Sequence, residues 1–248
     1  MGNLSRTLLL GLMVAGPSPA FAHLADLQVY DRTEHRLLTI HDYRGQRYVA
    51  GTPGHEYELR LRNDSGGRLL AVTSVDGVNV ISGETAAPEQ TGYVLPRYES
   101  LGIEGWRKSL EDVAAFYFTR LPNSYAARTG RPFDVGVIGV ALFREKTHCC
   151  DWFGQRQEMD DERAKDSAAP APNAQRKAEE KLGTGHGRRE HSEASYTEFE
   201  RASNAPDEIL AIYYDSRENL VAQGILPRET QYAERNPRPF PGSFVRDP

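Results

Sequence analysis

The stretch Tyr57-Glu58-Leu59-Arg60-Leu61-Arg62 alternates apolar and charged side chains at every position. Successive side chains of a β-strand point to opposite faces, so the apolar residues share one face and the charged residues share the other. The alternation predicts a strand with one buried and one solvated face. The polar, glycine-containing segment 63–67 that follows is typical of a turn. This stretch therefore indicates a sheet whose inner face packs against other apolar residues.

A hairpin is predicted immediately downstream. Two runs rich in β-branched residues, 69–75 and 78–81, flank Asp76-Gly77. An Asp-Gly pair favours a type I′ turn, because both central residues of that turn need a positive φ. The run 135–143 is apolar on both faces, which is typical of a strand buried on both sides or placed at the centre of a sandwich. Further strands are predicted at residues 36–40, 92–95, 100–106 and 113–118.

Short strands separated by turn residues, with little helical periodicity, predict a mainly β fold of the antiparallel β-sandwich type. We expect residues 23–150 to form its core. Residues 151–190 carry mixed charges and an Ala-Pro stretch, which predicts a charged flexible insertion.

Strand patterns return after the insertion, at residues 195–200, 208–214 and 219–225. With residues 215–218 as a turn, the last two predict a C-terminal β-hairpin. We expect residues 191–228 to pack on the core, because two or three strands are marginal alone. The Pro-rich residues 229–248 are expected to be irregular.

The composition restricts the function classes. The 248 residues carry 35 acidic against 30 basic side chains, a formal charge of −5, which argues against a nucleic-acid-binding module. Two cysteines exclude a scaffold held by many disulfides.

Residues 1–22 are typical of a Sec-type signal peptide. Arg6 precedes a short apolar run, and Ala20-Phe21-Ala22 forms an A-x-A cleavage site. We expect cleavage after Ala22, a mature chain that starts at His23, and a location in the periplasm or outside the cell. The apolar run is too short for a membrane span, so no stable membrane anchor is expected.

Several motifs are specific enough to compare with known families. They are the stretch 57–62, Val75-Asp76-Gly77-Val78-Asn79-Val80-Ile81-Ser82-Gly83, Gly105-Trp106-Arg107-Lys108-Ser109, Ser124-Tyr125-Ala126-Ala127-Arg128-Thr129-Gly130-Arg131-Pro132 and Gly183-Thr184-Gly185-His186-Gly187. Together they resemble an uncharacterised family of exported, periplasmic proteobacterial proteins over residues 43–226. The resemblance implies a Gram-negative envelope protein and brings neither an assigned activity nor functional residues.

Segment 124–132 is one candidate binding loop, because it connects two predicted strands. Tyr125, Arg128 and Arg131 are suited to gripping an anionic or sugar-like group. The alternative is structural: the tyrosine packs under the loop, and the arginines pair with acidic residues.

Segment 183–190 is a second candidate loop. Its glycines, Gly185 among them, allow a backbone to approach a ligand, and Arg188 adds a positive charge. His186 is suited to general-base chemistry. No Walker or dinucleotide-binding pattern is present, and the alternative is a flexible turn at the end of the insertion.

Two metal hypotheses follow from histidine and cysteine. A mature N-terminus at His23 offers an amine and an imidazole that chelate copper, with a second imidazole such as His186 completing the set. Other candidates for that second imidazole are His35, His41 and His55. The segment His148-Cys149-Cys150 offers zinc or copper(I) ligands, a vicinal disulfide, or an unreactive pair.

We therefore expect an exported, non-catalytic binding or structural protein of the envelope, whose partner is an envelope protein or a small anionic or sugar ligand. The alternatives are a copper-binding protein or copper oxidase centred on His23, and a hydrolase that uses His186.

Overall fold

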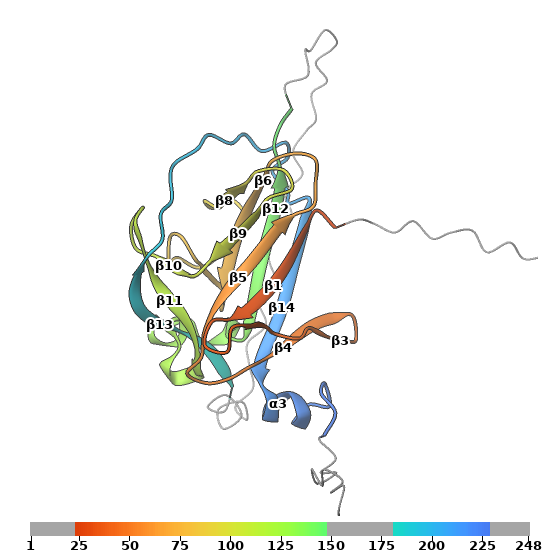
Figure 1. Cartoon of the computed structure of the whole chain (residues 1–248), viewed down its shortest axis with the longest axis vertical. Coiled ribbons are helices and arrows are strands. Elements are labelled where there is room, and N and C mark those ends of the chain that lie inside the picture. The colour runs from red at the N-terminus through yellow and green to blue at the C-terminus, as the bar shows by residue number, and fades with distance from the viewer. Residues whose placement is uncertain (1–22, 148–180, 229–248) are drawn as a thin grey trace, which may run out of the picture.

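The computed structural model describes residues 23–147 and 181–228, which fold into two packed β-sheets (Figure 1). The first sheet has the order β10–β11–β5–β1–β2, with β13 paired to β11 and β9 paired to β5. Its strands are β1 (Ala25–Asp31), β2 (Arg36–Leu37), β5 (Glu56–Asn63), β9 (Ser100–Ile103), β10 (Gly105–Arg107), β11 (Asp112–Arg120) and β13 (Leu182–His191).

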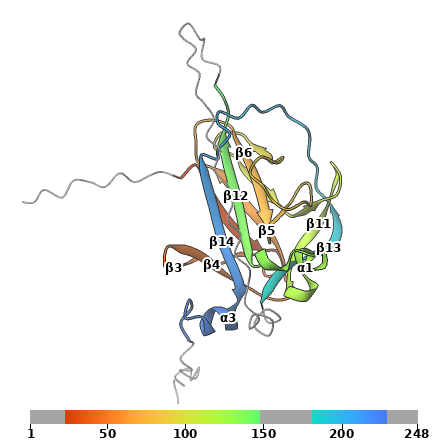
Figure 2. The same ribbon diagram turned by 180° about the vertical axis from the view of Figure 1, so that it is seen from behind.

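The second sheet has the order β3–β4–β14–β12–β6–β7, with β8 paired to β6. Figure 2 shows β14, β12 and β6 side by side from behind. Its strands are β3 (His41–Tyr43), β4 (Gln46–Gly51), β6 (Leu69–Val75), β7 (Val78–Asn79), β8 (Tyr93–Leu95), β12 (Val137–Arg144) and β14 (Glu208–Ser216). The helices are short: η1 (Leu121–Asn123), α1 (Tyr125–Arg128), η2 (Pro132–Asp134) and α3 (Arg217–Ala222). The predicted mainly β, sandwich-like fold is confirmed.

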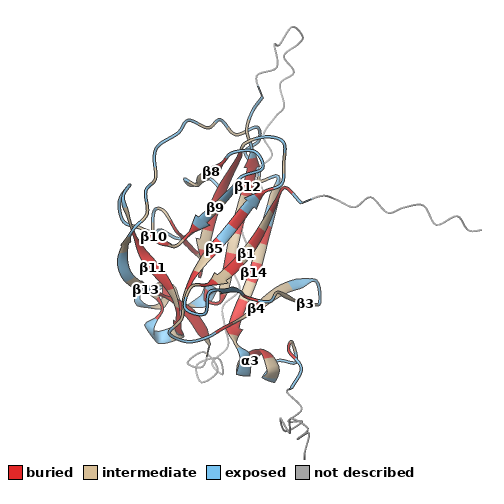
Figure 3. Cartoon of the chain, in the orientation of Figure 1, coloured by how far each residue is buried: buried red, intermediate tan, exposed pale blue. Residues whose placement is uncertain are grey.

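The alternation that predicted β5 is confirmed. Tyr57, Leu59 and Leu61 are completely buried between the sheets, whereas Arg60 and Arg62 are exposed. Figure 3 shows the same division, with buried residues alternating with less buried ones along the strands. Burying such side chains stabilises the fold by about 1.5–3 kcal/mol each, so the alternation holds β5 in one register.

The Asp76-Gly77 hairpin is also confirmed. Both residues have positive φ, 53° and 70°, and Val75 pairs with Val78 across the turn. The apolar run after residue 135 forms β12, which is central between β14 and β6. On its outer face Val137, Gly139 and Ala141 are only partly buried, so the strand alternates up to Leu142, whereas Phe143 on the same face is completely buried.

Other predictions hold in part. The strands predicted at 92–95, 100–106 and 113–118 correspond to β8, β9 with β10, and β11. The strand predicted at 36–40 is reduced to β2. β1, β3 and β4 had no counterpart among the predictions.

The predicted insertion is wrong at its end, because residues 182–191 form β13 instead of a flexible loop. This strand pairs with β11 along its whole length and buries Leu182 and Thr184. Its glycines serve close packing: a Cβ on Gly183 would lie 2.7 Å from Ser124 Cβ. The border expected at residue 190 therefore falls inside a strand. The rest of the expected insertion, and His148-Cys149-Cys150, lie outside the described residues apart from Lys181.

The predicted C-terminal hairpin is confirmed only in its first strand, β14. The second half is the helix α3, because Ser216 caps it by accepting a hydrogen bond from the backbone N of Asn219 at 3.2 Å. Gly224, at φ 74°, follows its end. The strand predicted at 195–200 is wrong as well: the segment is extended, but it pairs with no strand. It packs Phe199 on a small apolar cluster on the outer face of β6 and β12.

Within the described residues, no helix has the length and apolarity needed to cross a bilayer.

Candidate functional site

The two candidate segments meet in space. The ring of Tyr125, on α1, lies 5.6 Å from the ring of His186, on β13, with an angle of 33° between the planes. On its other side Tyr125 contacts the Trp106 ring, from β10, at 4.8 Å. Three segments far apart in the sequence thus place three rings in a row, ending at the exposed His186.

This row continues into the core. Trp106 meets Phe116 edge-on at 5.1 Å, and Phe116 stacks on Tyr57 at 5.4 Å. Tyr57 stacks on Phe118 at 4.3 Å, and Phe118 contacts Tyr214 at 5.4 Å. Aromatic contacts of this kind each stabilise by about 0.5–1.5 kcal/mol beyond area burial. The surface rings therefore rest on a packed column that restricts their orientation.

The surroundings of His186 are positively charged. Partial burial, followed by the charges of Lys108 and Arg128, lowers the pKa of His186 below its ordinary value, so the imidazole is neutral at pH 7. Lys108 and Arg128 are exposed, and the side chain of neither makes a hydrogen bond or ion pair with any residue of the two described ranges. We call Trp106, Lys108, Tyr125, Arg128 and His186 the basic ring patch.

Arg131, a predicted ligand-binding residue, holds the loop instead. Its Nη2 donates to the carbonyl of Gly83 at 3.1 Å and to Thr129 Oγ1 at 3.0 Å. Arg131 therefore has a structural role, but its partners are a carbonyl and a hydroxyl instead of the acidic residues that the structural alternative expected. α1 itself is fixed by Ser124, whose Oγ accepts a hydrogen bond from the backbone N of Ala127 at 3.2 Å.

Arg188 does not join the basic ring patch, because a β-bulge turns it away. Ala114 pairs with Arg189 and Phe116 pairs with His186, so Gly187 and Arg188 together stand opposite one residue of β11. Arg188 forms ion pairs with Glu56 at 2.9 Å and with Glu190 at 3.0 Å.

Gly185 positions the strand and is buried. Its carbonyl accepts a hydrogen bond from Trp106 Nε1 at 3.3 Å, and a Cβ at this position would lie 2.2 Å from the Tyr117 ring. Its role in the structure is to let β13 lie close to the rings of β10 and β11.

His23 lies far from His186. Its Nδ1 is 2.5 Å from Glu208 Oε1, at the first residue of β14. Tyr214 lies six residues further along β14, hence about 20 Å from Glu208. Its hydroxyl hydrogen-bonds the side chain of Thr184, two residues before His186 on β13. The structure thus does not bring the two predicted copper ligands together. His55, another candidate for the second imidazole, bonds Asp31 at the opposite end of β1 from His23.

A buried polar centre went unnoticed in the sequence. Asp76 is completely buried and accepts hydrogen bonds from Tyr214 OH at 2.5 Å, Thr184 N at 2.7 Å and Gly136 N at 2.8 Å. Burial raises the pKa of Asp76 to about 6, against the hydrogen bonds that favour its carboxylate. Thr184 Oγ1 in turn lies 2.6 Å from both the Tyr214 and Tyr57 hydroxyls. This network ties the β6–β7 turn of one sheet to β13 of the other.

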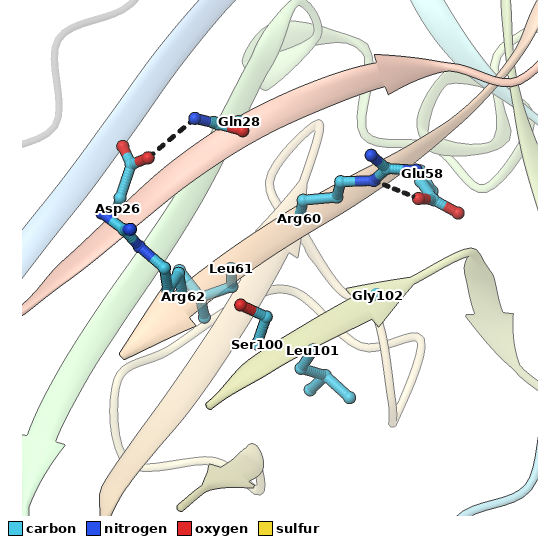
Figure 4. Close-up of a pocket in the computed structure, with 9 residues that line it drawn as sticks. All are labelled: Asp26, Gln28, Glu58, Arg60, Leu61, Arg62, Ser100, Leu101 and Gly102. Atoms are coloured by element: carbon cyan, nitrogen blue, oxygen red, sulfur yellow. Dashed lines mark hydrogen bonds and ion pairs between the residues drawn. The ribbon is translucent and has the colours of Figure 1, made fainter. Parts of the chain in front are cut away.

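Two further groups of polar side chains are internally satisfied. Figure 4 shows a shallow pocket of about 330 Å³ on β1, β5 and β9, where Gln28 bonds Asp26 and Arg60 bonds Glu58. Asp31, Glu34 and His55 have ligand atoms within 4.8 Å of one another, as a metal site would require. However, the Asp31 carboxylate is already hydrogen-bonded to His55 Nδ1 at 2.8 Å and accepts hydrogen bonds from two backbone N–H groups.

No protein-family model, no curated protein and no solved structure matches this chain.

Proposed function

We propose that this chain is an exported, non-catalytic binding protein that holds a small anionic ligand on the basic ring patch. The observation that carries the proposal is a pair of exposed cations, Lys108 and Arg128, that act electrostatically on His186 beside Tyr125 and whose side chains have no partner among the described residues. Elsewhere on β13, Arg188 and Arg189 are neutralised by carboxylates.

The patch combines two kinds of attraction. Lys108 and Arg128 supply charge-assisted hydrogen bonds to a carboxylate, sulfate or phosphate. The exposed parts of the His186 and Tyr125 rings offer apolar area against which the body of a small ligand packs. Because the imidazole is neutral at pH 7, it acts as a hydrogen-bond donor and acceptor and adds no charge.

The ring column supports recognition by a preformed surface. Tyr125 is fixed between Trp106 and His186, so little side-chain freedom is lost when a ligand binds. Lys108 and Arg128 differ from the rings in this respect, because their long, exposed side chains lose conformational freedom when a ligand orders them.

The proposed export rests on residues 1–22, which lie outside the described residues. Fractionation of expressing cells and N-terminal sequencing of the recovered protein test it. A chain recovered from the cytosol with Met1 intact would contradict export and leave the binding proposal to its own test.

Ligand binding is tested by titrating the purified protein with inorganic phosphate, citrate and glucuronate, followed by NMR shifts and calorimetry. We expect at least one anion to bind, with affinity that falls as salt rises. Lys108→Ala and Arg128→Ala should each weaken binding several-fold. Arg188→Ala is the matched control, because this exposed arginine is held by Glu56. Absence of binding by all three anions, or equal loss in the control, would refute the proposal.

A further inference from the structure

A second hollow, distinct from the basic ring patch, lies between the first half of β4, the end of β14 and α3. The helix α3 is at the lower end of the molecule in Figures 1 and 2. Its volume of about 740 Å³ falls in the range of about 300–1,000 Å³ that is usual for small-molecule sites. Its walls come from β4, β14, α3 and the segment that leads from η2 into β12.

One wall is an aromatic platform. Tyr48 and Tyr213 pair across the parallel strands β4 and β14, and their rings lie 5.5 Å apart. Both point outward, because their neighbours Val49 and Tyr214 are buried in the core. The Tyr48 hydroxyl donates to Gln46 Oε1 at 2.6 Å, and Gln46 Nε2 donates to the Tyr213 hydroxyl at 3.5 Å. The platform is therefore held in place before any ligand arrives.

A third ring belongs to the same hollow. Phe133 is 77% exposed, and it lies on η2, in a different segment from the two tyrosines. A phenylalanine this exposed has no core role. It supplies an apolar surface to whatever occupies the hollow.

The polar groups carry both signs of charge. Lys181 is the one cation among the lining residues, and Asp134 is an exposed carboxylate. The other lining carboxylate, Asp215, is already occupied: it accepts from Leu182 N at 3.1 Å, Ser216 N at 2.8 Å and Asn219 Nδ2 at 2.8 Å. The groups left for a ligand are thus a donor on Lys181, an acceptor on Asp134 and the amide oxygen of Gln223, whose Nε2 donates to Asp215 Oδ2 at 3.4 Å.

This combination selects the class of ligand. A purely apolar molecule would desolvate Lys181 and Asp134 without pairing them, which is unfavourable. A strongly charged ligand would be attracted by one of these two side chains and repelled by the other. A pyranose ring has an apolar C–H face for the tyrosines, and hydroxyl groups that both donate and accept.

We propose that the hollow bounded by Tyr48, Tyr213, Phe133, Lys181 and Gln223 is a binding site for a neutral saccharide. The sugar lies with its C–H face on the tyrosine platform, and its hydroxyls bond the polar side chains on the side of α3. This site does not depend on the proposed anion site.

The test uses the full chain and three neutral probes: cellopentaose, maltopentaose and an N-acetylglucosamine oligomer. Calorimetry and NMR measure binding of each. We expect at least one to bind. Tyr213→Ala should weaken that sugar about tenfold or more, since the platform loses a ring, whereas Tyr213→Phe should keep most of the affinity. Gln223→Ala should weaken it without touching the core.

Controls separate this site from other surfaces. Tyr98→Ala removes a ring that is 68% exposed and lies outside the hollow, so it should leave affinity unchanged. Arg128→Ala should do the same, because Arg128 belongs to the basic ring patch. Failure of all three sugars to bind would overturn the proposal. So would a sugar whose binding falls equally with Tyr98→Ala, or falls only with Arg128→Ala.

Discussion

The hydroxyl chain at the centre of the sandwich allows a sharp stability prediction. Thr184 Oγ1 lies 2.6 Å from the Tyr57 hydroxyl and 2.6 Å from the Tyr214 hydroxyl. Tyr214 also donates to Asp76, whereas Thr184 is the single side chain that hydrogen-bonds the Tyr57 hydroxyl among the described residues. Thr184→Val keeps the shape and the backbone N–H while it removes this hydroxyl.

The expected cost follows from what is left behind. In Thr184→Val the Tyr57 hydroxyl stays completely buried with no partner, which costs about 1–3 kcal/mol of unfolding free energy. Tyr57→Phe removes the other partner and leaves Thr184 bonded to Tyr214, so it should cost only about 1 kcal/mol. In the double variant no hydroxyl is orphaned. It should therefore be more stable than Thr184→Val alone, although it carries one more substitution.

Guanidinium chloride unfolding, followed by circular dichroism and extrapolated to water, measures the four free energies. A drop of about 2–4 °C in Tm for each kcal/mol provides an independent check. The reasoning is wrong if Thr184→Val is as stable as the wild type. It is also wrong if the double variant is less stable than Thr184→Val.

Three further predictions concern the buried acid, a tight strand crossing and the last helix. Because burial raises the pKa of Asp76 from 3.8 to about 6, the folded state holds its proton more tightly than the unfolded state. The free energy of unfolding contributed by this group therefore falls by about 3 kcal/mol as pH rises between those values. The difference in stability between wild type and Asp76→Asn should change by about that amount from pH 4 to pH 7. A difference independent of pH would contradict this prediction. A Cβ on Gly105 would lie 2.1 Å from the Ala114 carbonyl oxygen, so Gly105→Ala should destabilise by about 1–3 kcal/mol in thermal unfolding, and an unchanged Tm would be the contrary result. Ser216→Ala removes the cap of α3 and should cost about 1 kcal/mol, measured by denaturant unfolding. Ser195→Ala removes an exposed hydroxyl without a hydrogen bond to the described residues and should cost less; equal losses would count against the cap.

Local signals predicted the parts of the fold that depend on neighbours in sequence. The strict alternation of β5 follows from one buried face, and the Asp76-Gly77 turn follows from the backbone angles of those two residues. β13 carries neither signal. Its glycines are needed because side chains from other segments pack closely against β13, as Ser124 packs against Gly183. Those contacts come from residues about 60 positions away in the sequence.

The candidate site was predicted residue by residue but not as a group. Tyr125 and His186 were both singled out, and their contact depends on the pairing of β13 with β11. Arg188 was grouped with His186 because they are close in sequence, and the bulge separates them. Trp106 and Lys108 were not predicted as site residues. The local pattern around β10 does not show that this segment lies beside β13, about 80 residues further along the chain.

The position of β14 governs the order in which this protein is assembled. β14 joins β4, in parallel, to β12, and it is the last strand among the described residues. While a ribosome is still adding residue 200, the pieces β3–β4 and β12–β6–β7 have no strand to connect them. Contacts between segments this distant form slowly. A nascent polypeptide of this sequence therefore stays unfinished, and open to chaperones or a translocation channel, until residues 208–216 have been made.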